Sequence, residues 1–147
     1  MIAPRRAMIK TYLDANILIA AFRSDHPGSL PALSVLGDPY RVFVASQYLR
    51  LETLRKPLFY RRDDEIAFME AYFAAVSLWV PTDDSLVARA LKLAANLDLG
   101  AMDALHATCA LQGGAEEFIT LERPSKSICR IPGLFVVSLH PEAKTRS

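Results

Sequence analysis

The stretch MIKTYLDANILIAAF, residues 8–22, decides how the rest of the chain is interpreted. Met8 to Leu13 is a short apolar run with the length of a buried strand, and Ile17 to Phe22 follows at once as a short helix. Asp14 stands between the two runs and is the first polar residue after the strand. We therefore expect Asp14 to lie at the carboxyl end of a strand.

Short apolar runs alternate with helical patterns along the whole chain. Further strands are predicted at residues 41–45, 77–80, 117–120 and 134–137. Further helices are predicted at residues 29–36, 47–56, 63–76, 84–96 and 101–111. This alternation predicts an α/β domain with a mostly parallel, roughly five-stranded sheet that helices cover on both faces. Ligands of such sheets bind at the carboxyl ends of the strands, so chemistry is expected there.

Composition allows one ordinary globular domain over residues 1–147. Lys and Arg number 17 against 16 Asp and Glu, so the net charge of +1 gives no overall attraction to nucleic acid. Any RNA contact must come from local patches. We expect residues 1–7 and 141–147 to be flexible, because they carry no clear pattern.

The cysteines and the apolar runs indicate in which cellular compartment the protein is expected. Cys109 and Cys129 form neither a disulfide framework nor a metal-binding spacing, which suits a reducing cytoplasm. The N-terminus lacks a signal-peptide core, and the longest apolar run, Ile17 to Phe22, is far too short to cross a bilayer. The sequence therefore predicts a cytoplasmic protein without a membrane contact.

Asp14 and Asp103 each lie just after the boundary of a predicted element. For each of them, a structural role at a helix start is the alternative to a role in chemistry. Asp14 can cap the following helix by accepting from the amide of Asn16 or Ile17. Asp103 lies in the first turn of a predicted helix, where a carboxylate compensates the helix dipole. Small neighbours around Asp103 favour a lined pocket over a solvated face.

For Glu52 and Glu122, too, the sequence allows either a functional or a purely structural role. Glu52 lies about two turns into a helix, at the edge of its apolar stripe. We assign that stripe to Tyr48, Leu51, Leu54, Arg55 and Leu58. Alternatively, Glu52 is a surface acid that pairs with Arg55 or Lys56. Glu122 follows a predicted strand and either joins the acidic group, caps a short turn, or pairs with Arg123.

Together these acids predict a cation site. They come from distant segments and converge on one edge of one sheet, where clustered carboxylates repel one another unless a cation is present. Hard divalent cations such as Mg²⁺ prefer oxygen ligands and bridge to phosphate. The chemistry that follows is metal-assisted hydrolysis of a phosphodiester.

Four motifs carry a resemblance to a known family. They are YLDANILI at 12–19, the pair Ser46 and Glu52, MDALHA at 102–107, and FITLE at 118–122. In this order they resemble the motifs of PIN domains, and DALHA resembles the third motif of VapC-type toxins. The resemblance runs from about Met8 to Val137.

The resemblance implies an α/β/α sandwich that cleaves RNA as an endonuclease with Mg²⁺ or Mn²⁺. It also implies a homodimer and inhibition by a cognate antitoxin protein. The apolar residues of the predicted helix at 63–76 fit either such a dimer interface or the core. By resemblance the metal ligands are Asp14, Glu52, Asp103 and Glu122, and the supporting polar groups are Asn16, Ser46 and Thr120.

Two positions need separate comment: Glu122 departs from the family's pattern, and His106 lies within the third motif. Glu122 stands where the family usually has Asp, and its extra methylene favours a water-mediated contact and a site for one ion. His106 follows the third motif's acid, and we interpret it as a structural residue.

Substrate contacts are expected from cations near the acidic edge. The candidates are Arg55, Lys56, Arg61 and Arg62 after Glu52, and Arg123, Lys126 and Arg130 after Glu122. Each can equally belong to a solvated basic surface. Tyr60 can stack on a base, although we expect an aromatic residue at this position to pack.

Other functions stay open. A haloacid-dehalogenase-like phosphatase requires a second Asp where Asn16 stands, and a response-regulator receiver requires a Lys late in the chain that the segment 120–122 does not provide. A PIN-like protein-binding module without activity and a housekeeping RNA-processing nuclease are further alternatives.

Overall fold

The computed structural model describes residues 7–145. The predicted flexible ends, residues 1–7 and 141–147, fall partly outside this range. Within it, the chain closes with a short 3₁₀ helix, η2 (Pro141–Thr145). None of the helices in the described range has the length and apolar character needed to cross a membrane.

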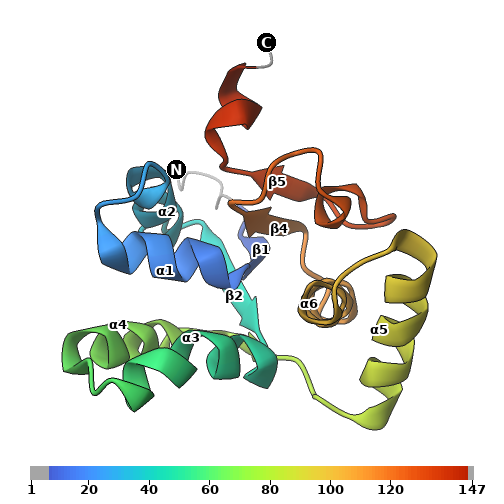
Figure 1. Ribbon diagram of the computed structural model, residues 1–147, viewed down its shortest axis with the longest axis horizontal. Helices are drawn as coiled ribbons and strands as arrows, with labels where there is room; N and C mark the ends of the chain where they lie inside the picture. The colour runs from blue at the N-terminus through green and yellow to red at the C-terminus, as the bar shows by residue number, and fades with distance from the viewer. Residues whose placement is uncertain (1–6, 146–147) are drawn as a thin grey trace, which may run out of the picture.

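A five-stranded, fully parallel sheet forms the centre of the molecule (Figure 1). The strands are β1 (Ile9–Leu13), β2 (Arg41–Ala45), β3 (Leu78–Trp79), β4 (Glu117–Thr120) and β5 (Val136–Ser138). Their spatial order is β3-β2-β1-β4-β5. The chain thus builds outward from β1 on one side and then crosses to the other side to form β4. The predicted parallel sheet is confirmed.

Helices cover both faces of this sheet. They are α1 (Ala15–Arg23), α2 (Ser29–Leu36), α3 (Gln47–Phe59), α4 (Asp63–Ala74), α5 (Asp84–Leu97), α6 (Ala101–Gln112) and the 3₁₀ helix η1 (Ser127–Arg130). Figure 1 shows α1 to α4 on one side of the sheet, and α5 and α6 on the other. The α/β/α arrangement follows.

Two apolar cores match these two faces. Alternate residues of β1 point in opposite directions, so Leu13 packs with α1 to α4 while Tyr12 packs with α5 and α6. Phe118 and Ile119 of β4 divide between the two cores in the same way. Every central strand is therefore buried on both sides, as parallel sheets require.

Helix α3 departs from its prediction in length and in orientation. It runs to Phe59 and includes Pro57, which is buried, instead of ending near Lys56. The last turn closes because the Tyr60 amide donates to the Lys56 carbonyl at 2.9 Å. The predicted apolar stripe is wrong, since Leu51 and Leu58 are exposed.

The buried face of α3 consists of Leu49, Thr53, Leu54 and Pro57. This face packs against α1 and α4. The apolar residues of α3 are spaced three and four apart in a way that fits two overlapping helix faces. Contacts with the neighbouring helices bury the face that includes Thr53 and Pro57.

Helix α4 supplies core residues. Met69, Tyr72 and Phe73 are buried and belong to the core on the α1 to α4 side. Of the two roles left open for this helix, the core role is confirmed for these three residues, and they are not available to a second copy of the chain.

Candidate metal centre

Asp14 lies where β1 ends and α1 begins. As the N-cap of α1 it accepts from the Ala15 amide through Oδ1 at 2.8 Å, and through Oδ2 it accepts from the Thr120 hydroxyl at 2.8 Å. The capping alternative is thus real, although the amide donor is that of Ala15 and not that of Asn16 or Ile17. Both carboxylate oxygens are held in place by these bonds.

The pKa of Asp14 is raised from 3.8 to about 6, first because of burial. His106 and the hydrogen bond from Thr120 lower the pKa, whereas the nearby charges of Asp103 and Glu52 raise it further. A buried acid that neighbouring acids make harder to ionise is a group that a cation would relieve.

Thr120 and Asn16 connect the start of α1 with the chain after β4. The Thr120 hydroxyl accepts from the Asn16 side-chain amide at 3.3 Å and from the Glu122 backbone amide at 3.1 Å. Asn16 also accepts from the Leu121 amide at 3.1 Å. These bonds span β1 and β4, where the strand order reverses and where ligands of parallel sheets bind.

Glu52 is oriented by a buried chain of hydrogen bonds. Its Oε1 lies 2.7 Å from Nε2 of His106, and the other ring nitrogen of His106 lies 2.7 Å from the Tyr12 hydroxyl. That hydroxyl lies 2.8 Å from the hydroxyl of Ser46, which caps α3 by accepting from the Leu49 amide.

The direction of each hydrogen bond in this series follows from the Glu52 carboxylate, which can only accept. His106 must then donate through Nε2, so in its neutral form it accepts from the Tyr12 hydroxyl through Nδ1. Burial raises the pKa of Tyr12 well above its ordinary value, so the phenol keeps its proton. The Ser46 hydroxyl is left to donate to Tyr12. Within the described residues, Glu52 forms no ion pair with Arg55 or Lys56, so the alternative role as a surface acid paired with them is not found.

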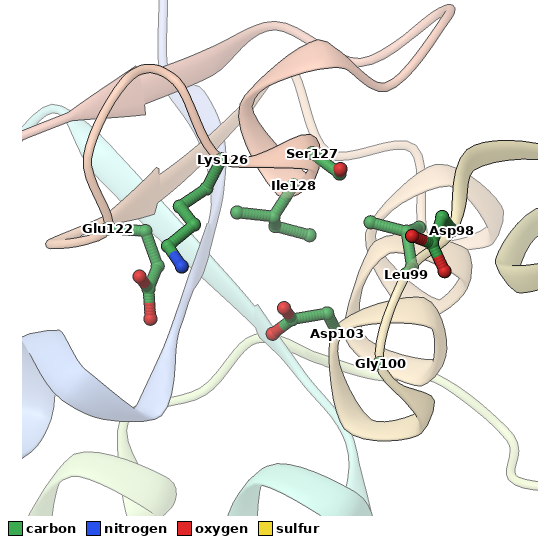
Figure 2. A pocket seen from close by; sticks show the side chains of 8 residues that line it. All are labelled: Asp98, Leu99, Gly100, Asp103, Glu122, Lys126, Ser127 and Ile128. Atoms are coloured by element: carbon green, nitrogen blue, oxygen red, sulfur yellow. The ribbon is translucent and has the colours of Figure 1, made fainter.

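Asp103 and Glu122 face one another across a hollow of about 300 Å³ (Figure 2). Its lining consists of Asp98, Leu99, Gly100, Asp103, Glu122, Lys126, Ser127 and Ile128. The Lys126 side chain extends toward the space between the two acids. Burial raises the pKa of Asp103, Glu122 and Glu52 raise it further, and His106 and Lys126 lower it.

The four predicted acids therefore share one region. One ligand atom each from Asp14, Glu52 and His106 lie within 4.8 Å of one another. Asp103 interacts electrostatically with Asp14 and Glu52, and Glu122 joins through Asp103. The carboxylate oxygens of this group are donors that fit a hard divalent cation such as Mg²⁺ or Mn²⁺, whereas His106 uses Nε2 to hold Glu52.

The predicted substrate cations lie in two places. Arg55 and Lys56 lie on the exposed face of α3, and Arg61 and Arg62 follow the end of that helix. Arg123 lies 3.9 Å from Glu142 as an exposed ion pair, so it does not pair with Glu122 as the alternative required.

One residue of this centre has no predicted role at the site. Tyr12 was assigned only to a strand, although a fully buried tyrosine needs a partner for its hydroxyl. Lys126, one of the cations after Glu122 that are expected near the acidic edge, does line the hollow together with Asp103 and Glu122. The hydrogen bonds of His106 agree with a structural role and also tie it to Glu52.

Solved structures of other proteins share this fold. A chain of the VapBC2 complex from Rickettsia felis, bound to a DNA fragment from its promoter, superposes with a TM-score of 0.67 at 15% identity, covering 88% of this chain and 98% of that chain. A chain of a toxin–antitoxin complex from Klebsiella pneumoniae gives 0.64 at 22% identity, with coverage of 88% and 98%. A chain of DNA-bound VapBC from Salmonella typhimurium gives 0.62 at 17% identity, covering 90% and 99%.

At these identities the structural likeness concerns the fold. No curated protein sequence matches the chain. The family model described as PIN domain matches residues 11–129, well over half of the chain. The protein therefore belongs to the PIN-domain family.

Proposed function

We propose that this PIN-domain protein is a Mg²⁺- or Mn²⁺-dependent endoribonuclease and the toxin of a toxin–antitoxin pair in the cytoplasm. The observation that carries the proposal is the gathering of Asp14, Glu52, Asp103 and Glu122 at one sheet edge, with the pKa of Asp14 raised to about 6. Such a set is poorly stable without a cation and well suited to one.

In this proposal Asp14, Glu52 and Asp103 hold the ion, and Glu122 contributes through water. When bound, the ion would activate a water molecule and neutralise charge that develops on the phosphodiester. Thr120 and Asn16 hold Asp14 and the chain after β4 in register. Ser46 supports Glu52 through Tyr12 and His106.

A direct test is metal-dependent cleavage of RNA. Purified protein is incubated with total tRNA and rRNA, with and without Mg²⁺ or Mn²⁺, beside the Asp14→Asn/Asp103→Asn variant. Discrete fragments from the wild type are expected only with metal, and the variant should lose on the order of 100-fold or more in rate. Asp84→Asn is the matched control, because Asp84 begins α5 at the end opposite the Asp98-lined hollow.

The outcomes separate the alternatives. Equal cleavage by the double variant would place the activity elsewhere or in a contaminant. No cleavage and no metal binding by folded wild type would favour a protein-binding module, which the departure at Glu122 keeps open. Cleavage without inhibition of cell growth would favour a housekeeping nuclease.

The antitoxin is proposed on the strength of the similar complexes, which are named as VapBC or toxin–antitoxin assemblies. The homodimer is proposed on the resemblance to VapC-type toxins. If the neighbouring gene encodes a small protein, its co-expression with this chain should yield one stable complex without ribonuclease activity. Light scattering of the separate chain tests the dimer, and a monomer at micromolar concentration would contradict it.

A further inference from the structure

The end of α3 carries two aromatic rings that the fold leaves outside. The Phe59 side chain is 78% exposed and that of Tyr60 is 58% exposed. The rings meet edge to face, with centroids 5.0 Å apart and planes at 85°. Adjacent exposed aromatic residues on a soluble domain are unusual and commonly mark a binding surface. The expectation that Tyr60 packs into the protein is wrong.

This end of the helix is well ordered by backbone bonds. The Tyr60 amide donates to Lys56, the Arg62 amide donates to the Pro57 carbonyl at 2.9 Å, and Arg61 turns the chain with a φ of 53°. The rings therefore sit on a closed helix end and not on an unsupported loop. A rigid aromatic surface loses little entropy when a planar ligand binds it.

Cations surround these rings. Arg55, Lys56, Phe59 and Tyr60 line a hollow of about 250 Å³, which we call the basic–aromatic hollow. Within the described range, neither Arg55 nor Lys56 forms an ion pair. Their charge is available to an anionic ligand.

The two rings have different surroundings. The Arg62 guanidinium lies over the Tyr60 ring, 4.9 Å from its centroid, and its Nη1 lies 3.6 Å from Glu65. One face of Tyr60 is thus already occupied by a cation, whereas no cation lies over Phe59 among the contacts of the described residues. Phe59 is the ring left open for stacking.

The hollow lies on the same helix face as the candidate metal centre. Glu52 and Phe59 are seven residues apart, which places them two turns and about 10 Å apart on one side of α3. Arg55 and Lys56 lie between them on that side. A strand of nucleic acid with one phosphate at the acids can follow this face and reach Phe59 within a short stretch.

We infer that the basic–aromatic hollow binds one unpaired nucleotide of an RNA substrate, with the base stacked on Phe59 and its phosphate against Arg55 and Lys56. This inference rests on the proposed function, because it assumes that RNA is the substrate. Bases in a duplex are stacked on one another and offer no free face, so the hollow selects single-stranded RNA. The unpaired cations favour a polyanion over an apolar protein segment.

Binding of a fluorescein-labelled oligouridylate in EDTA tests the inference without cleavage. Phe59→Leu should weaken binding about 10-fold, and Phe59→Trp should restore it. Arg55→Gln/Lys56→Gln should weaken binding and reduce the slope of log affinity against log salt by about 1.4. Phe135→Leu, at another exposed aromatic residue (68% exposed), should leave binding unchanged.

Each contrary outcome has one meaning. Equal oligouridylate binding by Phe59→Leu and wild type would overturn the inference, as would equal affinity of the wild type for an RNA duplex of the same length. Loss of antitoxin binding in Phe59→Leu with unchanged RNA binding would assign the surface to a protein and also overturn it. If wild type neither binds nor cuts any RNA, the proposed function itself has failed.

Discussion

Thr120 shows how much of this centre depends on a single hydroxyl group. It is fully buried, donates to Asp14, and accepts from Asn16 and from the Glu122 backbone. A β-branched residue suits the strand, and its hydroxyl at the end of β4 supports Asp14, which follows β1. Fold and site are therefore built by the same side chain.

Thr120→Val keeps the shape and removes the hydroxyl. Asp14 Oδ2 then loses its donor, and two partly buried donors lose their acceptor, so the free energy of unfolding should fall by about 1–3 kcal/mol. Loss of a supporting partner should also weaken Mn²⁺ binding by roughly 10-fold. Urea unfolding and titration calorimetry measure the two effects. Thr120→Ser, which keeps the hydroxyl, is the control, and an equal loss in both variants would point to packing alone.

At the scale of elements, α6 must lie close to the sheet to bring Asp103 and His106 to the acids. Gly113, which ends α6, allows this approach. A Cβ built there would lie 2.7 Å from a methyl of Val44 and 2.8 Å from a methyl of Val80. The backbone at Gly113 has a φ of −78°, so the requirement is one of space and not of conformation.

Gly113→Ala should therefore destabilise the protein by about 1–3 kcal/mol, because the added methyl overpacks the contact between α6 and the sheet. Thermal unfolding measures the change. Gly37→Ala is the matched control: Gly37 also ends a helix, and the nearest atom to its Cβ would be the Leu33 carbonyl oxygen at 3.4 Å. Equal stability of the two variants would show that α6 can move outward at no cost.

Elements were predictable where one pattern dominated. The strand at 41–45 and the helices from Ser29 and Ala101 begin where apolar runs, caps and glycines place them. Helix α3 was harder, because Leu51 and Leu58 fit an apolar stripe as well as Leu54 does. Only the packing of α4 against α3 decides which stripe is buried, and no local pattern contains that contact.

At the scale of the whole molecule, the strand order β3-β2-β1-β4-β5 gathers acids that are far apart in sequence. The convergence of Asp14, Glu52 and Asp103 was predictable, since parallel strands end at one edge and the motifs marked the acids. The residues that hold these acids by hydrogen bonds were not predictable from the sequence. That Tyr12 connects Ser46 to His106 depends on the distance between α6 and the sheet, which sequence spacing does not give.

The same gathering of charge predicts how stability and metal binding depend on pH. Folding raises the pKa of Asp14 from 3.8 to about 6. Its carboxyl group therefore favours the fold fully below its unfolded pKa, and this contribution is lost as pH rises through about 6. Without metal, Asp14→Asn should exceed wild type in stability by about 3 kcal/mol at neutral pH, and the difference should become small near pH 4.

A bound cation reverses the preference, because it favours the ionised carboxylate and releases a proton on binding. Addition of Mn²⁺ should therefore raise the melting temperature of wild type more at about pH 7.5 than at about pH 5. Asp14→Asn should lose most of that pH dependence, while Asp84→Asn should keep it. A metal-induced shift that is the same at both pH values would mean that ionisation of Asp14 is not coupled to the ion, and the ligand would have to be sought among Glu52, Asp103 and Glu122.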